Sequence, residues 1–291
     1  MEIKKALIVG LGSIGIRHLT MFNTVFPASV EIGVLRRSKE RPFKFVRNYF
    51  TSEQDAINWK PDIVIIASPS STHAHFTSSF RGCHILLEKP AVLNEQQLKV
   101  LSETPDKNLI QVGYNYRYHP VFLDLKDYLK TNKIKSIRLL HSDYLPNWHP
   151  WEDYRDSDLA RDGVGLTLCH GIDLILELFK DIDVLNLKKE CSKNLDIQSF
   201  SVFKGTCISE KTNIDWEIRV DDPKVNHFKF EVTDKMNKTL TFDMNTKKHT
   251  RNDTFISQVR DFKNKITTQK NFKDDNRKAF LRAKRIVEIC Q

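Results

Sequence analysis

A glycine-spaced turn near the N-terminus constrains the fold of this chain more than any other feature. The apolar run Leu7-Ile8-Val9 is followed by Gly10, Gly12 and Gly15, a G-x-G-x-x-G pattern that holds three of the chain's ten glycines. Residues 16–22 continue with the apolar spacing of a helix. A buried strand, a tight turn and a helix are therefore predicted in immediate succession.

This strand–turn–helix arrangement predicts a dinucleotide-binding site. The first glycine allows the tight turn, the second lets the backbone approach a pyrophosphate, and the third allows close packing of helix on strand. The backbone of Ser13 and Ile14, where the helix begins, would offer free N–H groups and a positive dipole end to the phosphates. An ordinary glycine-rich βα turn is the alternative interpretation of the same pattern.

Length and composition fit a globular protein of two domains. The chain has 291 residues, and a single core rarely grows past about 250–300 residues. Its hydrophobic and charged fractions of 40% and 29% are those of a soluble protein. No apolar stretch approaches the roughly 20 residues of a membrane span, and residues 1–5 leave no room for a signal peptide. We therefore expect a cytoplasmic protein without a membrane partner.

The net charge, the cysteines and the histidines exclude several kinds of partner. A net charge of +9 is compatible with an anionic ligand, but the basic residues are spread along the chain and form no recognisable nucleic-acid module, so no nucleic-acid partner is expected. The five cysteines are odd in number, scattered and without C-x-x-C spacing, which predicts reduced thiols. The histidines show no metal-ligand spacing, and no metal is predicted.

The end of the second predicted strand bears on the choice of cofactor. Residues 30–35 form a short apolar segment, and an acid at its end would normally bind the adenosine ribose hydroxyls. Arg36, Arg37 and Ser38 stand there instead, with no acid before Glu40. Guanidinium groups and a hydroxyl suit a 2′-phosphate, so NADP(H) is favoured. NAD(H) is possible if both arginines are merely solvated surface residues.

Strands and helices alternate over the first 115 or so residues. Apolar strands are predicted at 63–67, 84–87 and 109–113, with helices at 73–80 and 94–102. This alternation predicts a doubly wound parallel sheet with helices on both faces. Ligands bind such sheets where the strands end, which here places the loop Ser68-Pro69 and the Glu88-Lys89-Pro90 stretch beside the site.

The second half of the chain has a different pattern, in which several strands follow one another without helices. A helix over 121–129, a strand over 134–144 and a helix over 166–179 precede them. The expected strands and closing helices are 199–209, 215–220, 226–233 and 239–244, then 253–265 and 275–290. Successive strands indicate an open, mainly antiparallel sheet. The predicted domains are a Rossmann domain at 1–117 and an α/β domain at 118–291.

Together these motifs resemble the Gfo/Idh/MocA family of oxidoreductases. The resemblance covers nearly the whole chain and rests on the glycine turn, the Ser68-Pro69 loop with His73, the Glu88-Lys89-Pro90 signature, the crossover at 114–120 and the stretch 163–173. It implies an enzyme that transfers a hydride to or from a hydroxyl or carbonyl carbon of a sugar or nucleotide sugar. Residues 144–155 resemble members found in surface-polysaccharide biosynthesis, which tilts the expected substrate towards an activated sugar.

The resemblance also implies roles for two residues in catalysis. Lys89 would hydrogen-bond the reacting oxygen and stabilise developing alkoxide charge, and His170 would relay the proton. Family members commonly place an Asp shortly before this histidine, and the nearest equivalent is Thr167, whose hydroxyl cannot act as a base at neutral pH. A cofactor-binding sensor or regulatory protein that has lost turnover is therefore the alternative function.

The predicted ligand contacts fall into two sets. Cofactor-binding residues are expected to be Gly10, Gly12, Ser13, Ile14, Gly15, Arg36, Arg37, Ser38, Ser68, Pro69, His73, Glu88 and Lys89. Substrate-binding residues are expected to be Lys89, Tyr116, Arg117, Trp148, Tyr154, Arg155, Thr167, His170 and Asp173. For the aromatic and arginine residues of the second set, interdomain packing is an equally good interpretation. The resemblance further implies a homo-oligomer, a dimer or tetramer formed through the C-terminal sheet.

Overall fold

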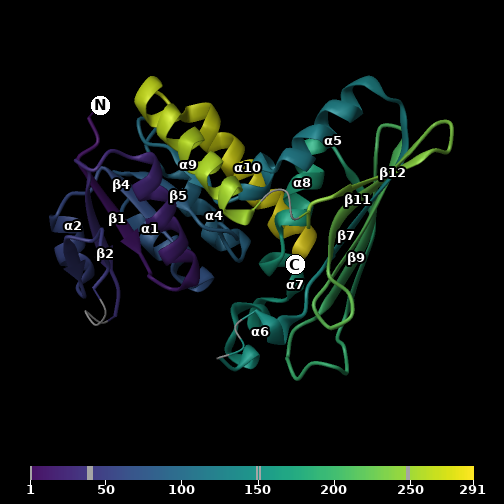
Figure 1. Cartoon of the computed structure of the whole chain (residues 1–291), viewed down its shortest axis with the longest axis horizontal. Coiled ribbons are helices and arrows are strands. Elements are labelled where there is room, and N and C mark those ends of the chain that lie inside the picture. Colours follow the sequence, from purple (N-terminus) through teal and green to yellow (C-terminus); the bar gives the residue numbers. More distant parts are fainter. Residues whose placement is uncertain (1, 38–41, 149, 151, 247–249) are drawn as a thin grey trace. The chain divides into compact units, whose positions relative to one another are not determined.

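The computed structural model describes residues 2–37, 42–148, 150, 152–246 and 250–291. The chain divides into two compact units (Figure 1). The first contains Met1–Asn115 and Arg251–Arg285, and the second contains Tyr116–Thr250 and Ile286–Gln291.

A six-stranded parallel sheet forms the centre of the first unit. Its order is β3-β2-β1-β4-β5-β6, the arrangement of a doubly wound dinucleotide-binding fold. The strands are β1 (Lys5–Val9), β2 (Glu31–Leu35), β3 (Asn48–Phe50), β4 (Ile63–Ile66), β5 (His84–Leu87) and β6 (Ile110–Val112). All four residues of β4 and of β5 are buried, as expected for strands covered on both faces. The predicted Rossmann fold is confirmed.

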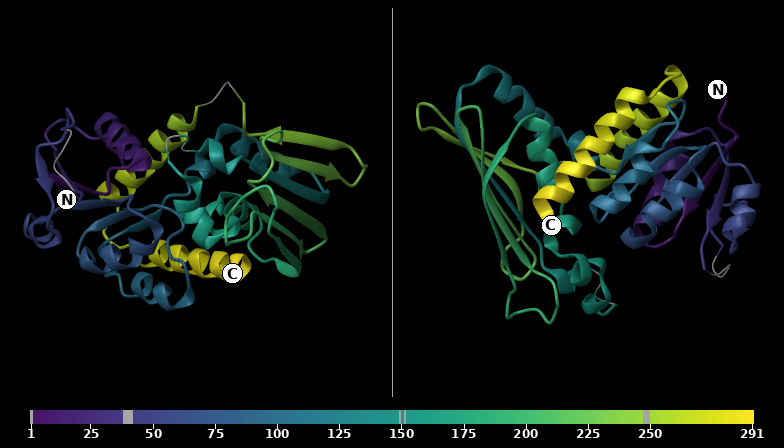
Figure 2. Two further views of the ribbon diagram at one scale, coloured as in Figure 1. Left: turned by 90° about the horizontal axis from the view of Figure 1, so that it is seen from below. Right: turned by 180° about the vertical axis from the view of Figure 1, so that it is seen from behind.

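Helices cover both faces of this sheet (Figure 2). They are α1 (Ser13–Val25), α2 (Glu53–Asn58), α3 (His73–Ser79), α4 (Glu95–Ser102), α9 (Arg251–Thr268) and α10 (Lys273–Cys290), the last turn of which belongs to the second unit. Side-chain caps begin two of the helices: Ser52 Oγ accepts the Asp55 N–H at 3.3 Å, and Asn94 Oδ1 accepts the Gln97 N–H at 3.0 Å.

The C-terminal helices return to the first unit, which differs from the predicted domain range 118–291. Phe255, Val259, Phe262 and Ile266 recur along one face of α9 and are buried in the same core as the apolar face of α1. The two helices lie side by side (Figure 1). This long-range packing is invisible to sequence periodicity, because an amphipathic face does not specify which surface it covers.

The second unit is built on a six-stranded sheet of order β12-β11-β7-β10-β9-β8. Its strands are β7 (Ile134–Ser142), β8 (Asp183–Glu190), β9 (Val202–Ser209), β10 (Thr212–Arg219), β11 (His227–Asp234) and β12 (Thr239–Asp243). Every neighbouring pair is antiparallel except the central pair β7–β10, so the mainly antiparallel prediction is confirmed. The edge strand β8 was not predicted, because its exposed residues lack the alternation of a half-buried strand.

The helices of the second unit lie on one face of its sheet, and the opposite face carries no described helix (Figures 1 and 2). They are α5 (Pro120–Thr131), α6 (Asp158–Asp162), α7 (Val164–Thr167) and α8 (His170–Leu178). The continuous helix predicted over 166–179 is wrong, because the chain turns at Leu168 and Cys169 and makes His170 the first residue of α8. Apolar residues stand on both sides of the break, so periodicity could not reveal it.

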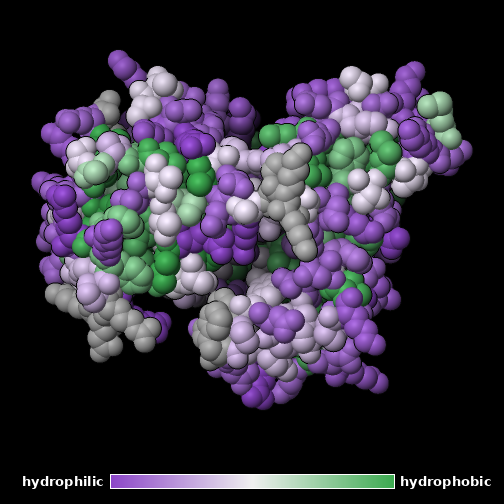
Figure 3. Space-filling view, viewed as in Figure 1, coloured by the Kyte–Doolittle hydropathy of each residue, from purple (hydrophilic) through white to green (hydrophobic). Residues whose placement is uncertain are grey.

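The face of the molecule shown in Figure 3 carries hydrophilic residues over both units, with hydrophobic residues gathered over part of the first unit and in smaller groups on the second. Among the described helices, none has the length and apolar character needed to cross a membrane. The five cysteines are present as free thiols.

Candidate functional site

The glycine turn lies where β1 ends beside β4, which is the point of the sheet where the strand order reverses. Gly10 has a φ of +85°, and a Cβ there would lie 2.8 Å from the carbonyl oxygen of Ala67 and from the backbone of Ser68. A Cβ on Gly15 would overlap the carbonyl oxygen of Gly10. The first and third glycines are therefore required by backbone conformation and by close packing.

The middle glycine and the start of α1 form an open cradle. A Cβ on Gly12 would have no neighbouring atom within 4 Å. No side chain caps α1, and no acidic residue lies in its first turn. The first turn of a helix leaves its N–H groups without intrahelical acceptors. The N–H groups of Ser13 and Ile14, at the exposed start of α1, therefore fit a phosphate group.

We expect alanine substitutions to separate the roles of these glycines. Gly12→Ala should leave the melting temperature unchanged but weaken NAD(P)H binding at least 10-fold, since a methyl group enters the space where a pyrophosphate would approach. Gly15→Ala should lower both the melting temperature and the affinity. Gly82→Ala is the matched control, because its Cβ also meets nothing within 4 Å. Equal cofactor affinities of Gly12→Ala and Gly82→Ala would contradict a phosphate site at this turn.

The structure holds Arg36 at the end of β2 against a neighbouring aromatic ring. Its guanidinium lies 5.0 Å from the ring centroid of Tyr49. Its backbone N–H donates to the carbonyl oxygen of Phe50 at 3.0 Å. Arg37 is exposed, and Ser38 lies outside the described residues. The Gly10 N–H donates to the carbonyl oxygen of Leu35, the residue before Arg36, at 3.0 Å. Arg36 is therefore a cation next to the glycine turn, and its contact with Tyr49 fixes its position.

Glu88, the residue before Lys89, is buried, and both oxygens of its carboxylate have a hydrogen-bond partner. Glu88 Oε1 lies 2.7 Å from Nε2 of the fully buried His18, and Oε2 accepts the Lys89 N–H at 3.2 Å. Burial raises the pKa of Glu88, but the hydrogen bond and charge of His18, with the charge and N–H of Lys89, bring the pKa below its ordinary value. A Cβ on Gly113 would lie 3.0 Å from Oε1, so this glycine makes room for the carboxylate.

His18 is a site residue that the sequence analysis missed. It lies one turn into α1, three residues after Gly15, and its ring packs edge-on against Phe255 at 5.2 Å. The sequence did place a polar residue on the buried face of the helix that follows the glycine turn. The role of His18 depends on Glu88, 70 positions away, and residue spacing does not identify that partner.

The loops that follow β4 and β5 meet at His73. The loop after β4 contains Ser68, whose hydroxyl lies 2.7 Å from that of Thr72, and the exposed Pro69. His73 is buried at the start of α3, with Nδ1 2.8 Å from the Pro90 carbonyl oxygen and Nε2 3.0 Å from the Ser68 carbonyl oxygen. Pro90 follows Lys89 through a cis peptide bond, and Lys89 itself is half-buried.

In the second unit, His170 belongs to an aromatic cluster. The rings of Tyr116 and His170 meet edge-to-face at 4.9 Å, and Tyr116 meets Phe228 of β11 at 4.8 Å. His141 of β7 stacks on Phe228 at 4.0 Å. The structure thus brings the predicted residues Tyr116 and His170 together. It adds His141 and Phe228, which the sequence analysis left out because their strands were separated by more than 80 residues.

Arg117 and Asp173, both predicted substrate contacts, bind each other. Arg117 Nε donates to Asp173 Oδ2 at 2.8 Å, and its Nη2 donates to Oδ1. Asp173 is fully buried. The pair ties the crossover segment to α8, one turn after His170, so it orients this helix. Thr167 is half-buried at the end of α7.

The remaining predicted substrate residues lie on the polar loop after β7. Arg155 is exposed and forms ion pairs with Asp153 and Asp196, and the hydrogen bonds and charge of Arg155 lower the pKa of Asp153 to about 2. Tyr154 Oη accepts the Asp196 N–H at 3.2 Å. The indole Nε1 of the half-buried Trp148 has no hydrogen-bond partner among the described residues.

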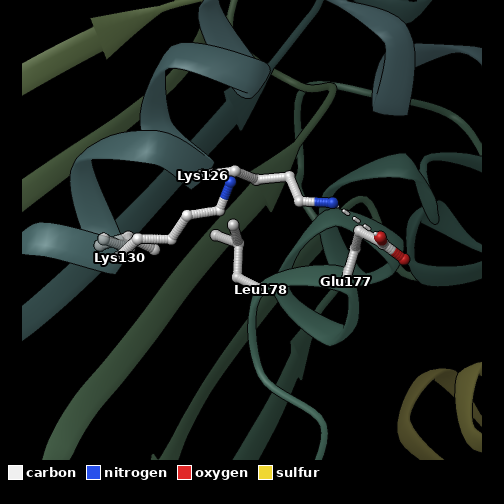
Figure 4. Close-up of a pocket in the computed structure, with 5 residues that line it drawn as sticks. Lys126, Lys130, Glu177 and Leu178 are labelled. Atoms are coloured by element: carbon white, nitrogen blue, oxygen red, sulfur yellow. Dashed lines mark hydrogen bonds and ion pairs between the residues drawn. The ribbon is translucent and has the colours of Figure 1, made fainter.

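One cavity of the second unit, about 230 Å³ in volume, contains none of the predicted site residues. Lys126, Leu129 and Lys130 of α5 line it together with Glu177 and Leu178 of α8 (Figure 4). Lys126 Nζ lies 3.0 Å from Glu177 Oε1, and Glu177 Oε2 lies 3.7 Å from Arg117. The cavity therefore borders the ion-pair network of Arg117. No group of three or more metal-ligating side chains occurs among the described residues.

Comparison with known proteins agrees with the geometry of the first unit. Residues 4–116 match the sequence model of the Gfo/Idh/MocA oxidoreductase family, described as an NAD-binding Rossmann fold. Oxidoreductase P35 of Formosa agariphila is 29% identical over 119 residues, which are 38% of this chain and 37% of that protein. The matched segment thus spans little more than a third of the relative's length.

Solved structures share the fold of the whole chain. Scyllo-inositol dehydrogenase from Lactobacillus casei, determined with NAD(H) and scyllo-inositol, aligns with a TM-score of 0.80 and 18% identity, over 99% of this chain and 96% of its own. The WlbA (WbpB) dehydrogenase from Thermus thermophilus, determined with NAD and UDP-GlcNAcA, gives 0.72 and 19%, over 97% and 94%. At such identities the likeness shows the fold of both units.

Proposed function

We propose that the protein is an NAD(P)-dependent oxidoreductase that acts on a hydroxyl or carbonyl carbon of a sugar or nucleotide sugar. The observation that carries the proposal is the placement of Lys89. It directly follows the buried Glu88 after β5, on the sheet edge where β1 ends in the open glycine cradle and β4 ends in the Ser68 loop. A dinucleotide held at this edge is bound where doubly wound sheets take their ligands.

In this proposal Lys89 and His170 handle the proton. The Lys89 ammonium donates a hydrogen bond to the reacting oxygen and stabilises the charge that develops there. The imidazole of His170, whose ring meets that of Tyr116, takes up or releases the proton of the substrate. A bound nicotinamide would supply or accept the hydride. Thr167 contributes a hydroxyl that can hydrogen-bond the substrate.

The proposed cofactor contacts are those predicted from the sequence, with different roles. Gly10, Gly12, Ser13, Ile14 and Gly15 hold the pyrophosphate, and the Ser68 and Pro69 loop borders the nicotinamide half. Glu88 and His73, both buried, act through the segment that carries Lys89. On the substrate side, Tyr116, Trp148 and Tyr154 offer ring faces, while Arg117, Arg155 and Asp173 act through their ion pairs.

We further propose a preference for NADP(H), with NAD(H) as the weaker ligand. The support is Arg36, a cation fixed beside the glycine turn by its contact with Tyr49, together with the exposed Arg37. A guanidinium in this place can bind the 2′-phosphate through two hydrogen bonds.

The experiment is a fluorescence titration of the purified protein with NADPH and NADH, followed by a screen for oxidation of sugars and nucleotide sugars by nicotinamide absorbance. We expect binding of both cofactors, with NADPH at least 10-fold tighter, and reversal of that ratio in Arg36→Asp. Absence of binding to either cofactor would refute the proposal. Binding with no turnover over a broad panel would favour the second candidate, a cofactor-binding sensor, for which Thr167 in place of an acid is the supporting feature.

The substrate class is supported by what related folds bind. Their ligands include scyllo-inositol and UDP-GlcNAcA, and the loop at 144–155 carries the aromatic and arginine residues expected of an activated-sugar site. We therefore propose a role in surface-polysaccharide biosynthesis. Free thiols at all five cysteines support a reducing, cytoplasmic setting.

We also propose that the protein forms a homo-oligomer, a dimer or tetramer, through the uncovered face of the second sheet. That face carries charges of both signs in pairs, such as Arg138 with Asp215 at 3.3 Å and Lys229 with Glu231 at 2.7 Å. Burial raises the pKa of Asp215 despite the charge of Arg138. Such a surface is complementary to a second copy of itself. The molecular mass in solution tests this proposal.

A further inference from the structure

The contacts of the two ring nitrogens of His73 depend on how many protons the ring carries. Both lie at hydrogen-bonding distance from backbone carbonyl oxygens, Nδ1 at 2.8 Å from Pro90 and Nε2 at 3.0 Å from Ser68. A carbonyl oxygen can only accept a hydrogen bond, so each nitrogen must carry a hydrogen if both contacts are bonds. A neutral imidazole has one N–H. Only the imidazolium donates from both nitrogens.

The surroundings of His73 make an unmet contact costly. The residue is 1% exposed, so water has little access to its two ring nitrogens. In a neutral ring, one nitrogen lone pair would face a carbonyl lone pair across about 3 Å of buried space. The charged residues of the Pro90 segment are Lys89 and Glu88, and the Glu88 carboxylate is bound by His18 and by the Lys89 N–H. On α3 itself, His75 points outward and pairs with Glu53 at 2.7 Å.

We propose that His73 is a positioning residue for Lys89, held as an imidazolium that fastens the loop after β4 to the loop after β5. The two neighbours of Lys89 are each fixed by a buried histidine. His18 holds the side chain of Glu88, and His73 holds the backbone of Pro90. The main chain of Lys89 is thereby held on both sides, and its side chain is half-buried. This role of Lys89 rests on the proposed function, whereas the protonation state of His73 does not.

The protonation state can be measured on the resting protein without substrate. Long-range nitrogen–proton NMR of protein labelled with nitrogen-15 in its ten histidines distinguishes an imidazolium from either neutral tautomer. The His73 signals are assigned by their loss in His73→Gln. At neutral pH we expect both His73 nitrogens to be protonated. A single protonated nitrogen at His73 would overturn the proposal, whether or not the protein turns over any substrate.

The positioning role is tested by kinetics of three variants. We expect His73→Ala to lower kcat at least 10-fold and to change the KM for substrate less than 3-fold. His73→Gln, whose amide can still donate to one carbonyl, should retain an intermediate kcat. His75→Ala on the same helix is the matched control and should match the wild type. A wild-type kcat in His73→Ala would overturn the positioning role, and if that variant fails to fold, an undiminished kcat in His73→Gln would do so.

Discussion

Replacing Lys89 by methionine is expected to lower kcat by about 10²–10⁴-fold, the range typical of a lost proton-transfer group. Methionine keeps much of the length and apolar stem of lysine but can neither donate a hydrogen bond nor carry charge. The backbone of this segment is held by His18 through Glu88 and by His73 through Pro90, so its conformation should survive the substitution. NAD(P)H affinity should therefore stay within about threefold of the wild type, because the glycine cradle is untouched.

The measurement combines cofactor titration with steady-state kinetics on a substrate found in the screen. Lys99→Met is the matched control, since the Lys99 side chain on α4 is 80% exposed and forms a surface ion pair with Glu103 at 3.6 Å. It should change neither kcat nor affinity. Near-native turnover in Lys89→Met would refute the proposed mechanism, while leaving cofactor binding as an independent result.

The first unit could be predicted from the sequence because its signals are local. Strands buried on both faces are continuous apolar runs, as in residues 63–66, and each is followed by a turn and an amphipathic helix. The return of residues 251–285 to this unit could not be predicted, because it depends on which apolar surface α9 covers. The break before His170 could not be predicted either. Within Val164–Leu168, every residue except Thr167 is apolar or glycine, so the hydrophobic pattern does not change where the helix ends.

The residues of the candidate site were predictable only where a motif carries them in consecutive positions. The glycine turn and the Glu88-Lys89-Pro90 stretch are motifs of this kind. His18 and His141 were missed because their meaning comes from partners distant in sequence, Glu88 and Phe228. Arg117 and Asp173 were identified, but spacing could not show that they bind each other across 56 positions.

Removing one partner of the ion pair of Arg117 and Asp173 should strongly destabilise the second unit. Asp173 is fully buried, and the side chain of Arg117 is 30% exposed. Arg117→Met removes the two guanidinium donors and leaves a buried carboxylate without its main partner, which costs about 3–5 kcal/mol of unfolding free energy. Urea unfolding followed by tryptophan fluorescence measures this loss, since the buried Trp216 lies in the same unit.

The double variant separates loss of the pair from exposure of a lone charge. In Arg117→Met with Asp173→Leu no charge remains to be buried, so we expect most of the lost stability to return, as when buried ion pairs elsewhere are replaced by apolar residues. Lys130→Ala is the surface control, because Lys130 and Asp127 are 70% and 73% exposed and such pairs contribute about 0–1 kcal/mol. If Arg117→Met and Lys130→Ala were equally stable, the pair would not stabilise α8. A double variant that is stable but turns over substrate more slowly than the wild type would show that these two residues act on the substrate side. Its lower turnover could not come from a defect in folding.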